Sequence, residues 1–424
     1  MAQTVAANPT GTRMMLGAVL VLAFMMNMFG RGATEAFAVF LLPVEKALGA
    51  TRSEITGVYS LFMLVVGLAG PFAGGVFDRL GARVSYCSGL VLLGGSFYLT
   101  GSATAVWHYA LTVGLASGLG VSMLGMVTAN ALLSRWYQMR LGTAIGVVYA
   151  ATGFGTLLMA PIAQLLIDAH GWRDAYRLIG GTLLMLALVA ALLPLTRMSR
   201  GSLEWQRRKA ATEAAMGGGW SVVRAMKTRS FWALTLVYFL TSCASFAVSP
   251  QAVAAMVEGG IAPLAAASAF GLTGMLSLIG NASVAPLVDR YGQRLTITLS
   301  YLGTVLGILC LAAVPSYPSI VLVYGWALLF GINQGTRGPI ISVLTATLFA
   351  GGGVGRIYGT IALGMGFGAA FGSWLSGLLH DMTGDYLASF MMAATSAALG
   401  MATFWTVPLL SEARAQLARQ STSD

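Results

Sequence analysis

Residues 78–83 read DRLGAR, and the same pattern returns as DRYGQR at residues 289–294, 211 positions further along the chain. The likeness continues beyond the hexapeptides, because residues 153–155 and residues 366–368 are both Gly-Phe-Gly, at an offset of 213. Internal repeats of this length mark many membrane-protein folds. The two hexapeptides therefore predict a duplicated architecture in which each half carries one copy.

The composition indicates an integral membrane protein. Hydrophobic residues make up 57% and charged residues 9% of the sequence, whereas soluble domains carry about 25% charged residues. The 54 glycines fit the close helix packing of membrane proteins. These values exclude a soluble enzyme, a disordered chain and a disulfide scaffold. The net charge of +10 follows from membrane orientation, so no nucleic-acid partner is expected.

Apolar segments long enough to cross a bilayer, about 20 residues each, occur twelve times. They cover 14–41, 54–77, 83–104, 107–134, 141–168, 173–196, 230–257, 264–288, 294–314, 318–348, 355–380 and 386–410. The only long connection is 197–229. The sequence thus predicts an all-α membrane protein of twelve transmembrane helices, with six-helix halves at 1–196 and 230–424 and a cytoplasmic basic linker at 197–229.

Lysines and arginines predict the orientation. Eighteen of them lie on the side of the N-terminus and the linker, and four lie in the opposite loops. Positively charged loops stay in the cytoplasm. We therefore expect both termini in the cytoplasm of a plasma membrane, and the compact loops favour a bacterial inner membrane.

The repeated hexapeptides in a six-plus-six frame resemble the major facilitator superfamily. Residues 135–146, followed by Gly171-Trp172-Arg173, resemble its monocarboxylate transporter branch, which includes the oxalate–formate exchangers. The resemblance implies transport of small carboxylates, often with a proton, by single chains. The first span departs from the branch, because Phe29-Gly30-Arg31-Gly32 replaces the acidic-Gly-aromatic signature of eukaryotic members, and Glu35 lies near their lysine.

Charged residues inside spans are costly and are functional candidates by default. Arg337 lies near the middle of the tenth span, and Asn333 and Gln334 share its helix face. The equivalent residue in the first half is Met126, so this charge is not part of the shared scaffold. The resemblance implies that the first, fourth, seventh and tenth spans line a central cavity, and it would place Arg337 there.

The first span carries its own polar stripe, with Asn27, Arg31 and Glu35 at successive intervals of four residues. Residues at this spacing can pair, so a purely structural ion pair stays open as an alternative. The predicted substrate-binding residues are Arg337, Arg31, Asn333, Gln334, Asn27, Ser242 and Tyr149. For Ser242 and Tyr149, helix packing remains the alternative.

The hexapeptides place acidic and basic residues at the cytoplasmic ends of helices. There, charges can bond between the halves and hold one state until the halves rock apart. The predicted gating residues are Asp78, Arg79, Gly81, Arg83, Asp289, Arg290, Gly292, Arg294 and Arg135.

No cofactor, metal site or enzymatic centre is expected. The sequence has no Gly-Lys-Ser/Thr loop for ATP, no metal-ligand spacing and no nucleophile–base cluster. Transport is then driven by a gradient or is facilitative, and the partners are the substrate anion, protons and the lipid bilayer.

The sequence predicts a proton-coupled monocarboxylate symporter that works by alternating access. Arginine binds carboxylates through two charge-assisted hydrogen bonds, and Glu35 is the predicted proton carrier. Three alternatives remain: a dicarboxylate exchanger that uses both arginines, an exporter of hydrophobic compounds, and a non-transporting membrane sensor.

Overall fold

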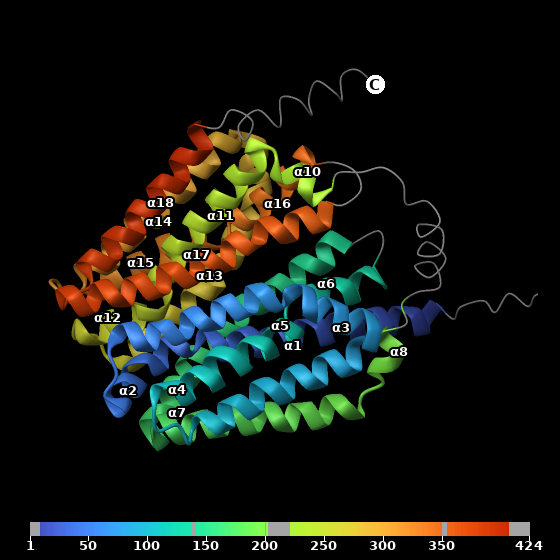
Figure 1. Cartoon of the computed structure of the whole chain (residues 1–424), viewed down its shortest axis with the longest axis horizontal. Helices are drawn as coiled ribbons and strands as arrows, with labels where there is room; N and C mark the ends of the chain where they lie inside the picture. The colour runs from blue at the N-terminus through green and yellow to red at the C-terminus, as the bar shows by residue number, and fades with distance from the viewer. Residues whose placement is uncertain (1–8, 138–140, 200, 202–220, 350–353, 407–424) are drawn as a thin grey trace, which may run out of the picture.

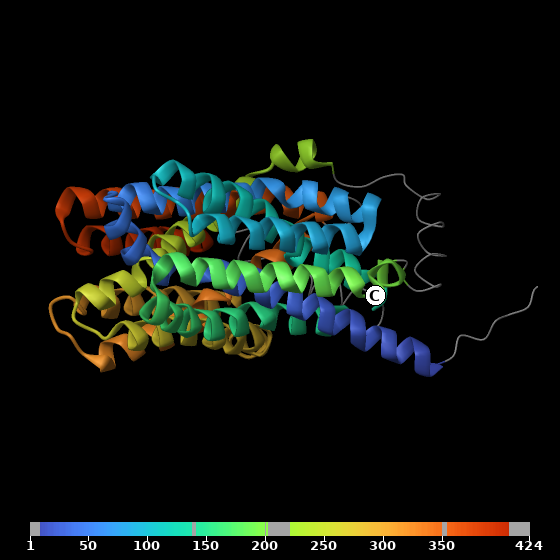
Figure 2. The same ribbon diagram turned by 90° about the horizontal axis from the view of Figure 1, so that it is seen from below.

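The computed structural model describes residues 9–137, 141–199, 201, 221–349 and 354–406. Every regular element in these ranges is helical (Figure 1), which confirms the predicted all-α class. Nine helical segments of the described chain are long and apolar enough to cross a membrane. Figure 2 shows the long helices running side by side along the long axis of the molecule.

The helices before residue 200 begin with a first span broken at Ala36. In chain order they are α1 (Pro9–Glu35), α2 (Phe37–Leu48), α3 (Arg52–Thr100), α4 (Val106–Tyr109), the π-helical η1 (Ala110–Ala116), α5 (Ser117–Leu124), α6 (Met126–Ser134), α7 (Leu141–Leu192) and α8 (Leu195–Ser199).

The helices after residue 220 follow the same plan. They are α10 (Val222–Met226), α11 (Arg229–Val248), the 3-10 turn η2 (Ser249–Gln251), α12 (Ala252–Glu258), α13 (Pro263–Tyr291), α14 (Gln293–Ala313), α15 (Ile320–Gln334), α16 (Arg337–Leu348), α17 (Val354–Thr383) and α18 (Leu387–Thr406).

Helix α3 folds back on itself at the glycine of the first hexapeptide. Gly81 has φ 82°, a backbone conformation that only glycine adopts at little cost. The two arms of α3 lie against the same neighbour, because Ser122 Oγ donates to the Val66 carbonyl at 3.4 Å while Ser85 Oγ donates to the Met123 carbonyl at 3.3 Å. The helix therefore supplies two antiparallel spans.

The same device recurs elsewhere. Gly171 interrupts α7 with φ 78°, and Gly292 of the second hexapeptide separates α13 from α14 with φ 82°. When α3 and α7 each count as two spans, and α15 with α16 as one, the described helices give one span for each of the twelve predicted segments, and residues 407–410 of the last segment lie outside the described chain.

The two groups of helices are visible in Figure 1, where α1 to α8 lie together and α10 to α18 lie together. They meet along two seams, α3 with α17 and α7 with α13. The domain boundaries at 196/197 and 229/230 stay predictions, and the predicted linker falls outside the described residues except for 197–199, 201 and 221–229.

Glycines allow the backbones to approach closely at both seams. A side chain at Gly366 would start 3.3 Å from the Cα of Gly67. At the other seam, a side chain at Gly153 would meet the carbonyl of Gly274. The high glycine content of the sequence thus has a local use where the two groups of helices meet.

We expect Gly153→Ala to lower thermal stability, because the added methyl group overpacks the α7–α13 seam, at a cost of about 1–3 kcal/mol. Gly146 lies on the same helix two turns earlier and has open space beside it. Gly146→Ala should therefore be neutral or stabilising by up to about 1 kcal/mol, the helix propensity gain. Melting curves of the purified variants would measure both effects, and equal shifts in the two variants would contradict the packing account.

Candidate functional site

An ion pair on α1 forms the charged part of the site. Arg31 Nη2 lies 2.9 Å from Glu35 Oε1, and the two side chains are 26% and 11% exposed. Two glycines fix the direction in which this pair projects. A side chain at Gly32 would meet the backbone of Gly155 on α7, and one at Gly30 would meet Leu124 on α5. Helical periodicity places Arg31 and Glu35 on the arc between these two contacts.

Three tyrosines from both groups of helices lie close together, one of them near Arg31. We refer to them as the tyrosine cluster: Tyr149, Tyr238 and Tyr358. Tyr149 of α7 is 45% exposed and lies within electrostatic range of Arg31 and Tyr358. The phenol oxygens of Tyr238 on α11 and Tyr358 on α17 are 2.8 Å apart. Phenols can donate or accept, so the cluster adds neutral hydrogen-bonding groups beside a cation.

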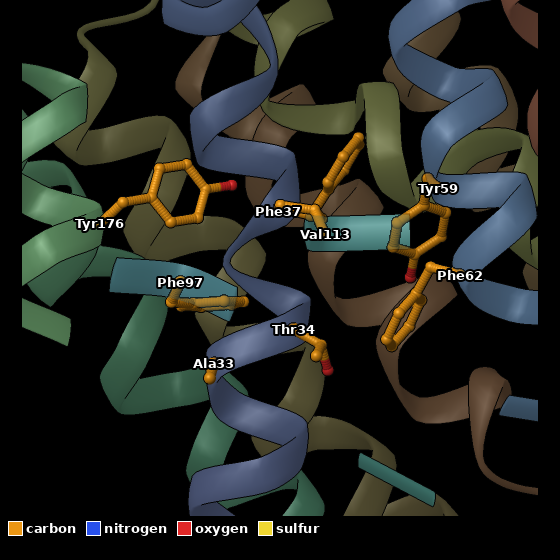
Figure 3. A pocket seen from close by; sticks show the side chains of 8 residues that line it. All are labelled: Ala33, Thr34, Phe37, Tyr59, Phe62, Phe97, Val113 and Tyr176. Atoms are coloured by element: carbon orange, nitrogen blue, oxygen red, sulfur yellow. The ribbon is translucent and has the colours of Figure 1, made fainter. Parts of the chain in front are cut away.

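An aromatic wall lies next to the ion pair. A cavity of about 10 Å³ is lined by Ala33, Thr34, Phe37, Tyr59, Phe62, Phe97, Val113 and Tyr176. Figure 3 shows these side chains, five of which are aromatic, around the cavity. The volume is close to the minimum for one water molecule. The cavity is therefore too small to hold an organic anion in this state.

Thr34 connects this wall to the ion pair. Its hydroxyl donates to the carbonyl of Arg31 at 3.0 Å, and the phenol of Tyr59 lies within electrostatic range of both Glu35 and Arg31. The pair thus lies close to both the aromatic wall and Tyr149 of the tyrosine cluster.

Arg337 is directed toward α14. Its side chain is buried, with Nη2 bonded to the Thr304 hydroxyl and Nε donating to Ser300 Oγ at 3.4 Å. The guanidinium carbon lies 4.5 Å from the ring centre of Tyr301. Within the described part of the chain no carboxylate pairs with Arg337, and its Nη1 has no hydrogen-bond partner.

The other predicted binding residues divide between these two places. Asn27 is fully buried one turn before Arg31 and donates to the Ala23 carbonyl at 3.0 Å. Ser242 is buried on α11, one turn after Tyr238. Asn333 packs against Gly303 of α14, the same helix that Arg337 contacts. Gln334 is half-buried at the end of α15.

Arg31, Glu35 and Tyr149 are therefore brought together, whereas Arg337 and Asn333 lie against α14. Sequence reasoning did not select Tyr358 and did not include Tyr238 in the predicted binding set. Tyr238 lies one helical turn before Ser242 in the seventh span, and this spacing of polar residues is the signal that could have indicated it. Tyr358 stands in a glycine-rich stretch without polar periodicity, so nothing local distinguished it.

Arg135 and the residues of the first hexapeptide make contacts among the helices before residue 200, and in the second hexapeptide the Arg290 guanidinium carbon lies 5.4 Å from the ring centre of Tyr291. Arg135 Nη2 is 2.8 Å from Asp78 Oδ1, and its Nη1 donates to the Ser199 carbonyl at 2.7 Å. Arg83 donates to the Ala191 carbonyl at 2.7 Å. Bonding between the halves at this end stays a prediction for these residues and for Arg79, Asp289, Arg290 and Arg294.

Comparison with protein families gives a match to the model described as Major Facilitator Superfamily, over residues 20–250 and again over 234–422. Monocarboxylate transporter 13 of Rattus norvegicus is 26% identical over 395 residues, which is 92% of this chain and 88% of the relative. Monocarboxylate transporter 12 of Mus musculus is 24% identical, covering 87% of this chain and 80% of the relative. For monocarboxylate transporter 11 of Homo sapiens the identity is 27% and the shares are 89% and 79%.

Solved structures show the same fold. A D-xylose-proton symporter superposes with a TM-score of 0.71 at 14% identity, over 92% of this chain and 97% of that one. A partially occluded, inward-open xylose transporter of E. coli gives 0.70 at 14% identity, over 92% of this chain and 98% of that one.

Proposed function

This chain belongs to the Major Facilitator Superfamily, and we propose that it carries a small organic anion, a monocarboxylate, together with a proton across the membrane by alternating access. Its relatives are transporters and not enzymes. The names of the curated relatives support a monocarboxylate as the substrate class. The observation that carries the proposal is the partly accessible Arg31 beside Glu35 and the tyrosine cluster.

Arg31 is the proposed anchor for the carboxylate. Its guanidinium can give two parallel charge-assisted hydrogen bonds, and one cation matches one monoanion. Tyr149 and the Tyr238–Tyr358 pair come from helices on opposite sides of the seams. Rocking of the halves therefore changes the distances among these phenols, which supports a site that closes around its ligand in one part of the cycle.

Glu35 is the proposed proton site. While it is ionised, it occupies Arg31 at 2.9 Å, so substrate and carboxylate compete for the same guanidinium. Protonation of Glu35 removes its charge and frees Arg31 for the anion. This competition gives a physical reason for one proton to move with one monocarboxylate.

Uptake into proteoliposomes tests the function. We expect an inward proton gradient to accelerate uptake of at least one labelled monocarboxylate from a panel of short-chain acids, 2-oxo acids and 2-hydroxy acids. An ionophore that collapses the gradient should abolish the acceleration. If no carboxylate enters faster with the gradient than without it, the proposal is wrong.

Replacing Glu35 with Gln should abolish proton-driven uptake and leave substrate exchange intact, since the amide cannot carry the proton but no longer holds Arg31 by charge. The pH dependence of uptake and of counterflow would be measured in the same vesicles. Asp174→Asn is the matched control, because it removes an acid from the exposed Asp174–Arg177 pair at 2.9 Å. An unchanged pH profile in Glu35→Gln would refute the coupling role.

Exchange of a dicarboxylate held by Arg31 and Arg337 is the second candidate. It is less well supported, because Arg337 is engaged with hydroxyl groups of α14. Strict preference for dianions in the same uptake panel would favour it.

We further propose that the working unit is a single chain in a bacterial inner membrane, with both termini in the cytoplasm. The eighteen-to-four distribution of lysine and arginine supports this orientation.

A further inference from the structure

A buried arginine ties several helices together at the end of the bundle opposite the hexapeptides. Arg52 is 2% exposed, and its Nε lies 2.7 Å from Glu45 Oε2 on α2. Its Nη2 lies 3.0 Å from Glu258 Oε1 on α12, and its Nη1 donates to the Tyr386 hydroxyl at 2.6 Å. Tyr386 in turn donates to Glu258 Oε2. Two of these contacts, from Arg52 to Glu258 and from Arg52 to Tyr386, join segments from opposite sides of the seams.

A carboxylate from α17 also completes the first turn of α3. Asp381 Oδ1 accepts from the Arg52 backbone N–H at 2.9 Å, and Oδ2 accepts from that of Ser53 at 2.8 Å. The remaining first-turn groups are satisfied within α3, because Thr51 and Glu54 form a capping box. Helix N-termini favour negative charge and leave N–H groups without partners. Asp381 therefore caps α3 from the other group of helices.

The repeat shows that this arrangement exists at only one seam. Asp168 is the counterpart of Asp381 at the offset of 213, and it accepts from Gln164 of its own helix at 2.7 Å. Pro263 is the counterpart of Arg52 at the offset of 211 and likewise occupies the first turn of its helix, α13. Proline has no N–H and no charge. The α7–α13 seam therefore lacks both the side chain and the backbone donor that Arg52 provides.

We propose that Arg52, Asp381, Glu258 and Tyr386 form a one-sided latch that holds this end of the halves together and breaks before the site opens there. The latch lies on the α3–α17 seam, so the opposite seam acts as the hinge at this end. Arg52 and Asp381 are the essential members, because Arg52 bonds across the seam to Glu258 through its side chain and to Asp381 through its backbone N–H. The inference rests on alternating access and on no particular substrate.

Cysteine labelling of purified protein tests the latch without any transport measurement. Ser249 of η2 is 3% exposed and packs against α2 between the two groups of helices, so a cysteine there reports opening of this end. The probe is a maleimide, applied to Ser249→Cys on a background with Cys87, Cys243 and Cys310 replaced by Ala. We expect Asp381→Ala to speed labelling about tenfold, because the closed state loses two charge-assisted hydrogen bonds.

Asp168→Ala is the matched control and should leave the rate unchanged, since Asp168 makes no bond across its seam among the described contacts. A variant retaining only Cys310 on α14 should label at the same rate with and without Asp381→Ala, which separates opening from general unfolding. Equal labelling rates of Ser249→Cys with Asp381 present or replaced would overturn the latch. If Asp381→Ala does not purify, Glu258→Ala removes one Arg52 partner without touching the helix cap, and no increase in that variant would overturn the latch equally.

Discussion

Replacing Arg31 with Gln is expected to raise the dissociation constant of the proposed monocarboxylate substrate about 100-fold. The loss follows from a charge-assisted pair of hydrogen bonds, about 2–3 kcal/mol, and each 1.4 kcal/mol is tenfold in affinity. At a ligand concentration of about 100 times the wild-type dissociation constant, thermal stabilisation should fall from about 2.7 kcal/mol to about 0.4 kcal/mol. Melting curves with and without the acid would measure both values.

Arg177→Gln is the control for this experiment. Arg177 pairs with Asp174 at 2.9 Å on the exposed surface and belongs to no predicted site, so its removal should leave the ligand-induced shift unchanged. A full stabilising shift in Arg31→Gln would show that the anchor lies elsewhere and would direct attention to Arg337.

Replacing Arg337 with Met is expected to raise thermal stability by about 1–2 kcal/mol while slowing transport at least tenfold. A buried charge without a counter-ion is costly, and hydrophobic replacements of buried ionic groups are often stabilising. The hydroxyls left behind keep other partners, since Ser300 and Thr336 bond each other at 2.5 Å and Thr304 donates to the Ser300 carbonyl at 3.0 Å. Met already occupies the equivalent position, 126, in the first half.

Thermal stability and transport rate together distinguish a functional arginine from a structural one. Costly charges inside membrane helices mark functional positions, so a more stable but impaired variant would support a role in the transport cycle. A variant that melts earlier and transports normally would show that Arg337 only holds α14 in place. Met126→Leu is the matched control, because this volume-conserving change should alter stability by less than about 1.5 kcal/mol.

Local periodicity predicted much of the fold. The twelve apolar segments and the repeated hexapeptides needed only helix length and self-similarity, and the Arg31–Glu35 pair needed only the spacing of one helical turn. The repeat also predicted that Gly81 and Gly292 hold equivalent places, which the matching φ angles show.

Contacts between distant segments could not be predicted in this way. Helical spacing placed Arg337 and Asn333 on one face, but it does not tell which neighbour that face meets, and the neighbour is α14. The place of Tyr358 in the site follows from its hydrogen bond with Tyr238, a partner 120 positions away in the sequence. In the sequence, Arg52 is only one of four basic residues in the outer loops. Its role could not be predicted, because its partners Glu258 and Tyr386 lie 206 and 334 positions further along the chain.

The one-residue reversals at Gly81 and Gly171 have a consequence for biosynthesis. With almost no loop between its arms, each long helix cannot place one arm in the bilayer while the other waits outside. The arms are expected to enter as a preformed helical hairpin, so that the polar hexapeptide at residues 78–83 never crosses the hydrocarbon. The two spans of each hairpin then take up their membrane orientation together, as one unit.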